Sequence, residues 1–141
     1  MNSVRLFSFG GGVQSVAVAC IQALGRLKVP YDYFVYASVG HDSENPETIN
    51  YLNFVFKPWA LANNIPFLEV SKKGKTLLQY TLSMENKTVP LPVYLQSGAP
   101  GNRSCTYGWK VKPVNDWIKA NGYTHAEIGI GFSMDEIERC N

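Results

Sequence analysis

Residues 8–15, with the sequence SFGGGVQS, hold three consecutive glycines between two serines. Gly10, Gly11 and Gly12 carry no Cβ, so the backbone can turn sharply there and a ligand can approach it closely. The hydroxyls of Ser8 and Ser15 can donate hydrogen bonds to the oxygens of an anion. A tight turn without a ligand is the alternative interpretation of the same residues.

The glycine loop lies between two elements that the sequence predicts. Residues 4–9 are a short apolar and aromatic run, which is typical of a buried strand. Residues 15–24 have the pattern of a helix, which Gly25 closes. Such a helix directs free N–H groups and the positive end of its dipole at the loop. Strand, loop and helix together predict an anion site, and phosphate is the usual anion.

The spacing of the glycines excludes two common phosphate loops. The Gly-Lys-Ser/Thr ending of a Walker loop is absent, and so is the Gly-x-Gly-x-x-Gly dinucleotide pattern. The loop resembles the PP-loop of the ATP pyrophosphatase family, Ser-Gly-Gly-x-Asp-Ser. Aligned on Ser15, the family's first serine falls on Gly10, its glycines on Gly11 and Gly12, and its aspartate on Gln14. Gln14 keeps hydrogen-bonding capacity but lacks the negative charge of the aspartate.

Length and composition predict one globular domain over residues 1–141. Hydrophobic residues make up 45% and charged residues 17% of the chain, which excludes a disordered protein. No apolar run approaches the roughly 20 residues of a membrane span, and the N-terminus does not resemble a signal peptide. Three scattered cysteines give no disulfide framework and suit a reducing compartment. We therefore expect a cytoplasmic protein without membrane association.

Positive charge gathers in the middle of the chain. Residues 71–120 hold eight Lys and Arg against two acidic residues, whereas the remaining residues hold five against nine. Such a basic segment can face nucleic acid or a phosphorylated nucleotide. We predict nucleic acid as a partner of the basic residues between Lys72 and Lys119, with a solvated surface as the alternative.

The order of the predicted elements indicates an α/β fold. Strands are predicted at residues 33–39, 65–70 and 125–131. Helices are predicted after Asn45, where Pro58 kinks or splits the helix, at 76–84, and through 114–118 with Pro113 in the first turn. This alternation predicts an open, mostly parallel sheet with helices on both faces, a Rossmann-like arrangement. Ligands bind at the C-terminal ends of such strands, where residues 10–15 and 40–47 both lie.

Three further segments resemble the phosphoadenylylsulfate (PAPS) reductase branch of the PP-loop family. Residues 40–48, GHDSENPET, are similar to its Thr-Gly-x-x-(x)-Pro-Glu-Thr segment, with a spacing to proline that is one or two residues longer. Residues 105–113, CTYGWKVKP, resemble Cys-Thr/Cys-x-x-x-Lys-x-x-Pro. Residues 131–139, GFSMDEIER, resemble Gly-Ile-Ser-x-Asp-Glu-x-x-Arg, with Phe132 between Gly131 and Ser133. The resemblance implies an adenine nucleotide alpha hydrolase-like fold.

The resemblance also implies a reaction and its residues. ATP would be attacked at its α-phosphate, releasing pyrophosphate and adenylylating a substrate that is a nucleic acid or is related to sulfur chemistry. Mg²⁺ would bridge the phosphates, with Asp42, Glu44 and Glu47 as candidate ligands and no certain one among them. The implied catalytic candidates are Lys110, Arg103, Arg139 and Cys105. The implied nucleotide-binding candidates are Ser8, Gly10, Gly11, Gly12, Gln14, Ser15, Ser38 and Gly40.

Two other functions stay open. A thiol-dependent reductase of a sulfonucleotide would need a nucleophilic cysteine, for which Cys140 is the late candidate, although the reductases' Glu-Cys-Gly-x-His tail is absent. A non-catalytic nucleotide-binding module is the other alternative, favoured by Gln14. Cys105 alone cannot supply the ligands of the four-iron cluster found in adenylylsulfate reductases, so no cluster is expected. Family members continue into another substrate-binding segment, which the resemblance implies is missing here.

Overall fold

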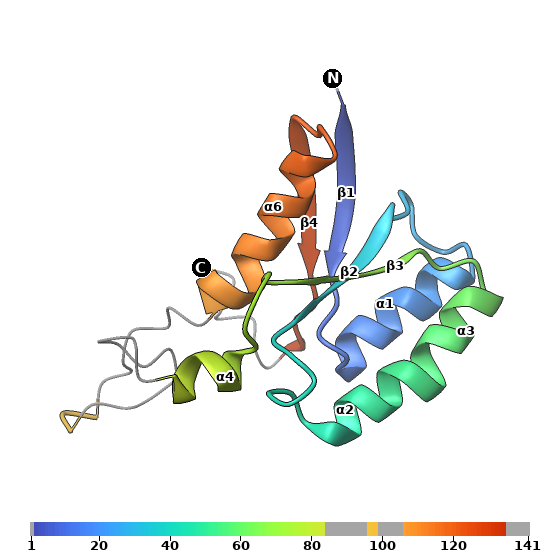
Figure 1. The fold of residues 1–141 in the computed structure, drawn as a ribbon. Coiled ribbons are helices and arrows are strands. Elements are labelled where there is room, and N and C mark those ends of the chain that lie inside the picture. The colour runs from blue at the N-terminus through green and yellow to red at the C-terminus, as the bar shows by residue number, and fades with distance from the viewer. Residues whose placement is uncertain (1, 84–95, 99–105, 135–141) are drawn as a thin grey trace.

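The computed structural model describes residues 2–83, 96–98 and 106–134 and shows an open parallel sheet (Figure 1). All pairings among the described strands are parallel. The four strands, in the spatial order β3-β2-β1-β4, are β1 (Ser3–Ser8), β2 (Tyr33–Ser38), β3 (Phe67–Ser71) and β4 (His125–Ile130). The predicted α/β fold class is confirmed.

The strand order places a topological switch between β1 and β4. The chain steps outward from β1 to β2 and β3, and then returns to the other side of β1 as β4. Crossovers leave β1 and arrive at β4 on opposite faces of the sheet, so a crevice opens at the C-terminal ends of these two strands. The glycine loop directly follows β1 at this end.

Helices cover both faces of the sheet (Figure 1). One face carries α1 (Val13–Ala23) and a helical rod made of α2 (Pro46–Tyr51), the π-helical turn η1 (Leu52–Phe56) and α3 (Lys57–Ala62). The other carries the π-helical turn η2 (Tyr107–Val111) and α6 (Lys112–Ala120), whereas α4 (Leu77–Leu82) follows β3. No helix in the described segments is long and apolar enough to cross a membrane.

Both π-helical turns end two residues before a proline. Pro58 is the second residue of α3, and Pro113 is the second residue of α6. Proline has no amide hydrogen to donate to the preceding turn of an α-helix, so a wider turn is tolerated there. Pro58 thus follows a π-helical turn inside a helical segment that runs without a break from Pro46 to Ala62, while the helix that contains Pro113 begins further upstream than predicted.

Side chains alternate between two cores because successive strand residues point to opposite faces. Phe7, Phe34 and Tyr36 pack against α1 and the α2–η1–α3 rod, where Phe56 is 1% exposed. Val4, Leu6 and Val35 pack on the other face against α6, through Ile118 and its neighbours. Each face of the sheet is thus covered, as expected for parallel strands.

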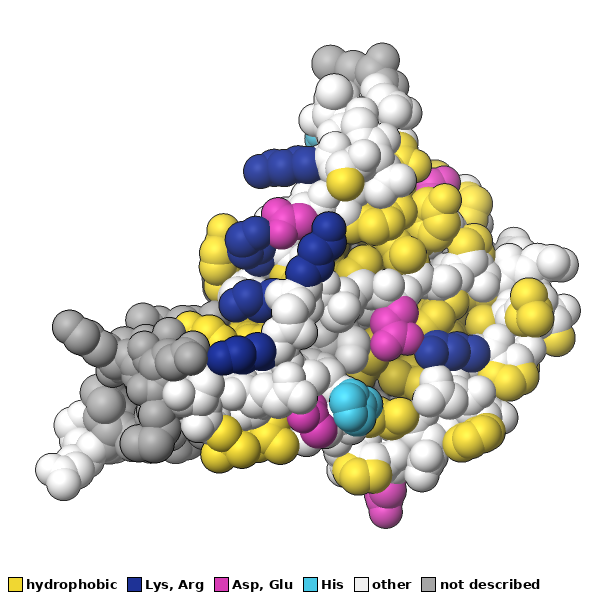
Figure 2. All heavy atoms as spheres, viewed as in Figure 1, with side chains coloured by type: hydrophobic (Ala, Val, Ile, Leu, Met, Phe, Trp, Pro, Cys, Tyr) yellow, Lys and Arg dark blue, Asp and Glu magenta, His cyan; other side chains and the backbone are white. Residues whose placement is uncertain are grey.

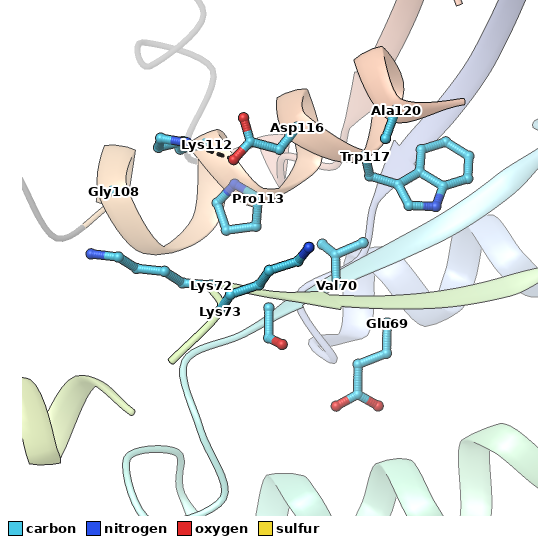
Figure 3. A pocket seen from close by; sticks show the side chains of 11 residues that line it. Glu69, Val70, Lys72, Lys73, Gly108, Lys112, Pro113, Asp116, Trp117 and Ala120 are labelled. Carbon is cyan, nitrogen blue, oxygen red and sulfur yellow. Dashed lines mark hydrogen bonds and ion pairs between the residues drawn. The ribbon is translucent and has the colours of Figure 1, made fainter. Parts of the chain in front are cut away.

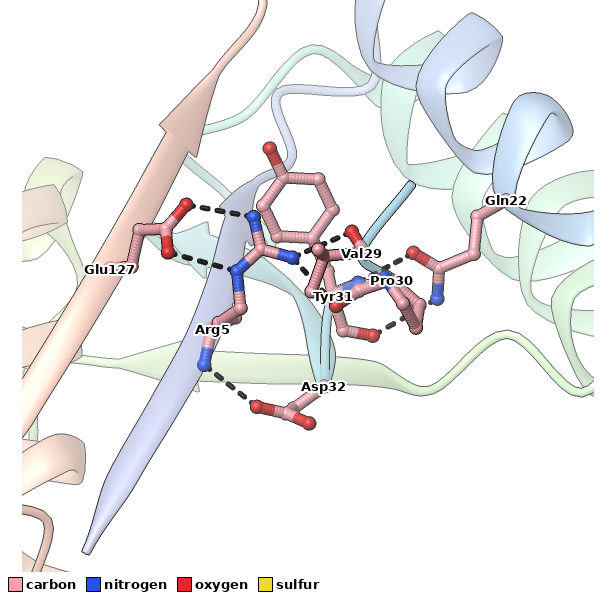
Figure 4. A network of polar contacts seen from close by, with 7 residues as sticks. All are labelled: Arg5, Gln22, Val29, Pro30, Tyr31, Asp32 and Glu127. Atoms are coloured by element: carbon pink, nitrogen blue, oxygen red, sulfur yellow. Dashed lines mark hydrogen bonds and ion pairs between the residues drawn. The ribbon is translucent and has the colours of Figure 1, made fainter. Parts of the chain in front are cut away.

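A polar network fixes the alignment of β1 with β4 (Figure 4). Arg5 donates from Nε and Nη2 to the two carboxylate oxygens of Glu127, at 2.9 and 2.8 Å, and from Nη1 to the carbonyl of Val29 at 2.6 Å. The hydrogen bonds from Arg5 hold the pKa of the Glu127 carboxyl below its usual value. Gly129 of β4 leaves room for the Tyr31 ring, since a Cβ there would lie 2.8 Å from the Tyr31 Cζ. These contacts fix the two strands between which the crevice opens.

Candidate functional site

The glycine loop is closed by a hydrogen bond across its mouth. The amide of Gly10 donates to the Ser15 Oγ at 3.2 Å, and Ser15 is only 8% exposed. Gly11 has a φ of +79°, a conformation that favours glycine. Ser15 thus shapes the loop from within, and its hydroxyl, which accepts this bond, keeps a hydrogen that it can donate.

The loop leads directly into the N-terminus of α1. Gly12 is the N-cap residue, and the first intrahelical hydrogen bond runs from the Val16 amide to the Gly12 carbonyl at 3.1 Å. The amides of residues 13–15 precede this bond, and no acidic residue lies in the first turn. The positive end of the helix dipole is therefore not neutralised by a neighbouring carboxylate, which favours an anion at this position.

Loops from two other strands pack against the glycine loop. The Thr48 methyl group, in the first turn of α2, lies 3.6 Å from where a Cβ on Gly11 would stand. After β4, a Cβ on Gly131 would lie 3.1 Å from the Cβ of Gln14, so this glycine allows the two backbones to approach closely. The segments that follow β1, β2 and β4 therefore meet at one edge of the sheet, where the sequence predicted a site.

The loop after β2 is held by α4. Gly40 has a φ of +118°, and a Cβ on it would lie 2.6 Å from the Cβ of Thr76, the N-cap residue of α4. Thr76 and Ser43 each donate a hydroxyl hydrogen bond to Asp42, at 2.8 and 2.9 Å. Partial desolvation raises the pKa of the Asp42 carboxyl, but these hydrogen bonds outweigh it and hold the pKa below its usual value. The Ser43 hydroxyl in turn accepts a hydrogen bond from the Leu78 amide at 2.8 Å. Asp42 therefore docks α4 directly through Thr76 and indirectly through Ser43.

A cavity of about 480 Å³ opens beside the glycine loop, between the sheet and the η2–α6 segment. Its walls are mainly apolar, with contributions from Leu6, Val35, Val114 and Ile128. Six residues with polar or charged groups line it: Ser8, Tyr36, Glu44, Thr106, Lys110 and Asn115. Gly10 also lines it, so the cavity is continuous with the loop. Cavities of this size, apolar with a few polar groups, are typical of small-molecule sites.

The structure brings together some of the predicted site residues. Ser8, Gly10 and Lys110 line this cavity, and Gly11, Gly12, Gln14 and Ser15 form the loop beside it. Ser38 instead accepts a hydrogen bond from the Gly40 amide at 3.3 Å and lines a smaller cavity of about 290 Å³ beside η1 and α3. Gly40 is packed against Thr76. Arg103, Cys105, Arg139 and Cys140 lie outside the described residues.

The buried Tyr36 lies beside the half-buried Glu44, a pair that the sequence did not predict. Tyr36 is 6% exposed, and neither its hydroxyl nor the Glu44 Oε2 makes a hydrogen bond within the described residues. Burial, followed by the nearby Glu44 carboxylate, raises the pKa of the Tyr36 hydroxyl. An unpartnered carboxylate oxygen at the edge of a cavity is suited to accept a hydrogen bond or to contact a cation.

The candidate metal ligands differ in their availability. Asp42 is occupied by two hydroxyl groups, and Glu47 is exposed in the first turn of α2. Glu44 lines the cavity and keeps one oxygen without a partner among the described residues. That part of the chain contains no group of three or more His, Cys, Asp and Glu that could hold a metal by itself. A Mg²⁺ ion held mainly by substrate phosphates needs only one or two carboxylates, which Glu44 can supply.

Fold and site together define an open parallel α/β protein with a glycine-rich loop and an adjoining cavity at the switch between β1 and β4. Comparisons of the chain with protein-family models, with curated proteins and with solved structures found no match. The function is therefore argued from the geometry of the site and from the sequence motifs.

Proposed function

We propose that this chain binds ATP with Mg²⁺ and cleaves it between the α and β phosphates, transferring AMP to an acceptor, as the PP-loop ATP pyrophosphatases that it resembles do. One observation carries the proposal. The glycine loop and the acid-free N-terminus of α1 adjoin a mainly apolar cavity of about 480 Å³ that Lys110 reaches. Amides and a helix dipole suit phosphates, whereas apolar walls suit a nucleobase.

The site residues divide into three tasks in this proposal. The loop amides and the hydroxyl of Ser15 hold the phosphates at the N-terminus of α1. Lys110, which makes no ion pair with a described residue, neutralises charge that develops around the α-phosphate. Glu44 would hold the metal ion with its unpartnered oxygen.

The transfer of AMP from ATP to the acceptor needs no reactant besides these two. A nucleophilic group of the acceptor attacks the α-phosphorus, and the bond from that phosphorus to the bridging oxygen breaks. The electron pair leaves with pyrophosphate, and the acceptor's proton passes to a base or to solvent. Lys110 stabilises this step only if its ammonium lies near the reacting phosphate, so its charge is the feature to test.

The test uses ATP labelled at the α-phosphate, incubated with the protein and Mg²⁺, with and without an RNA and small-molecule extract as a source of acceptor. The proposal predicts pyrophosphate with AMP or an adenylylated product, and it predicts no ADP. Lys110→Gln should slow product formation about 100-fold, the usual effect of removing one group that stabilises the transition state. The control Lys28→Gln removes an exposed lysine between α1 and β2 and should leave the rate unchanged. ADP and phosphate as products would contradict the proposal.

A non-catalytic nucleotide-binding module is the second candidate, and Gln14 favours it. The PP-loop motif has an aspartate at this position, and the first turn of α1 contains no acidic residue. A comparison of ATP binding with ATP cleavage distinguishes the enzyme from the binding module. ATP binding by calorimetry without any cleavage, in every acceptor mixture, would select the module, and the absence of binding would overturn both candidates.

A further inference from the structure

A second, larger cavity of about 720 Å³ lies on the other side of the η2–α6 segment, along β3 (Figure 3). β3 is the outer strand of the described sheet. We name this cavity the β3–α6 groove, and its lining residues used below are Lys72, Lys73, Lys112, Asp116 and Trp117. It is separate from the cavity beside the glycine loop, and none of its lining residues also lines that one.

The charge of the β3–α6 groove is positive. Three lysines line it, while Asp116 is engaged by Lys112 at 2.6 Å. Glu69 also contributes to the lining, but its side chain points away from α6 and pairs with Lys57 at 2.8 Å (Figure 3). Lys73 makes no ion pair with a described residue, so its charge is available to a ligand.

The cations extend over a distance too long for a single small anion. Lys112 and Lys119 are seven residues apart on α6 and so share one side of the helix, about 10 Å apart along its axis. Figure 2 shows the Lys and Arg side chains gathered over this part of the molecule. Phosphates of a stacked strand repeat about every 3.4 Å, so this length matches roughly three of them.

Aromatic rings accompany the cations. Trp117 lines the groove and is held in place by Tyr33 and Tyr123, with ring centroids 5.4 and 5.8 Å away. The Lys72 ammonium lies 4.6 Å from the centre of the Trp109 ring, which fixes the end of β3 against η2. Lysines that follow a backbone, next to a rigid ring on which a base can stack, are the combination that binds single-stranded nucleic acids.

We infer that the β3–α6 groove binds a single-stranded nucleic acid, with its phosphates along Lys73 and Lys112 and a base against Trp117. Lys119 does not line the groove, but it continues the row of cations along α6 from Lys112. An acidic peptide paired with the free edge of β3 is the competing occupant. It would use the charges but would give no role to the indole of Trp117, so the observations favour nucleic acid. This inference does not rest on the proposed cleavage of ATP.

The test is fluorescence anisotropy with labelled 12-nucleotide oligouridylate and oligothymidylate at several salt concentrations. Each phosphate contact contributes about 0.7 to the slope of log affinity against log salt for single strands. The double variant Lys73→Gln, Lys119→Gln should therefore reduce the slope by about 1.4 and weaken binding at low salt more than tenfold. The control Lys28→Gln removes a lysine outside the groove and should change neither quantity. An equal effect of the control would overturn the inference.

Two further readings test the site and the class of partner. Binding should quench tryptophan emission, and Trp117→Phe, which keeps an aromatic ring for packing, should remove most of the quenching. Saturating ATP should not displace the oligonucleotide. Displacement by ATP, equal competition by a duplex, or equal competition by polyglutamate of the same charge would each contradict a groove for single strands. Failure of these readings would leave ATP cleavage unaffected, so the two proposals fail separately.

Discussion

Gly10→Ala separates a binding loop from a merely structural turn. Gly10 lines the cavity beside the loop, and a Cβ on it would meet no atom within 4 Å. Its φ is outside the left-handed region, so alanine can adopt the same backbone. The fold should therefore tolerate the methyl group and can gain up to about 1 kcal/mol from a less flexible unfolded chain.

The same methyl group would stand in the open space where a phosphate approaches the loop. Displacing one phosphate oxygen from one backbone amide removes a hydrogen bond to a charged group, worth about 1.5–3 kcal/mol. The dissociation constant for ATP with Mg²⁺ should then rise about ten- to a hundredfold. Calorimetry would measure this constant, and urea unfolding would measure stability in parallel.

Gly108→Ala is the matched control, since a Cβ there also meets nothing within 4 Å and Gly108 does not line the cavity beside the loop. It should leave ATP affinity unchanged. Unaltered affinity in Gly10→Ala, with stability unaltered as well, would refute the placement of phosphates on this loop. If Gly10→Ala instead lost more than about 2 kcal/mol of stability, the space beside Gly10 would be filled by other atoms in solution. Substitutions at the surface away from packed features usually change stability by no more than about 0.5 kcal/mol.

Three predictions concern the surroundings of the loop. Gly40→Ala should lower the free energy of unfolding by more than about 2 kcal/mol in a urea titration, because alanine would adopt a strained φ and its Cβ would collide with Thr76. An effect near zero would contradict this packing. Tyr36→Phe should change stability by less than about 1 kcal/mol, since it removes a buried hydroxyl without a partner among the described residues; a much larger loss would reveal a hydrogen bond that this geometry lacks. The pKa of the Asp42 carboxyl is lower in the folded than in the unfolded chain, so the unfolded chain binds more protons in acid. The contribution of Asp42 to stability is therefore present above about pH 4 and is lost as the pH falls through the folded-state pKa. Thr76→Val, compared with wild type by thermal unfolding at pH 7 and pH 3, should therefore destabilise more at pH 7, and an equal effect at both values would argue against it.

The strands and their parallel order follow from local patterns in the sequence. The predicted strand at residues 33–39 is observed as Tyr33–Ser38, and the predicted strand at 65–70 as Phe67–Ser71. Continuous apolar runs bounded by glycine and proline leave few other arrangements, and the intervening helices require parallel crossovers. The helix predicted at 76–84 is observed as Leu77–Leu82, with a capping box between Thr76 and Gln79.

The position of Ser38 could have been deduced from strand parity. Residues two apart on a strand share a face, so Ser38 lies with Tyr36 on the side of the α2–η1–α3 rod. Val35 and Ala37, whose side chains point to the other face of the sheet, line the cavity beside the loop, and Tyr36 also contributes to its lining. The resemblance to a family motif placed the end of β2 near the ligand, but it could not distinguish the two faces.

Other features depend on contacts between segments far apart in the chain. The docking of α4 through Asp42 joins residues more than thirty positions apart. No local pattern encodes the contact between Asp42 and Thr76, so the sequence left Asp42 as one of three candidate metal ligands.

The most direct test of the account is a titration of ¹⁵N-labelled protein with ATP and Mg²⁺, followed by the backbone amide resonances. We predict that the largest shifts fall on Gly11, Gly12 and Val13, with smaller ones on the residues that line the cavity of about 480 Å³. If ATP at millimolar concentration leaves these three amides unmoved, or shifts only amides along the β3–α6 groove, the glycine loop is not a phosphate site.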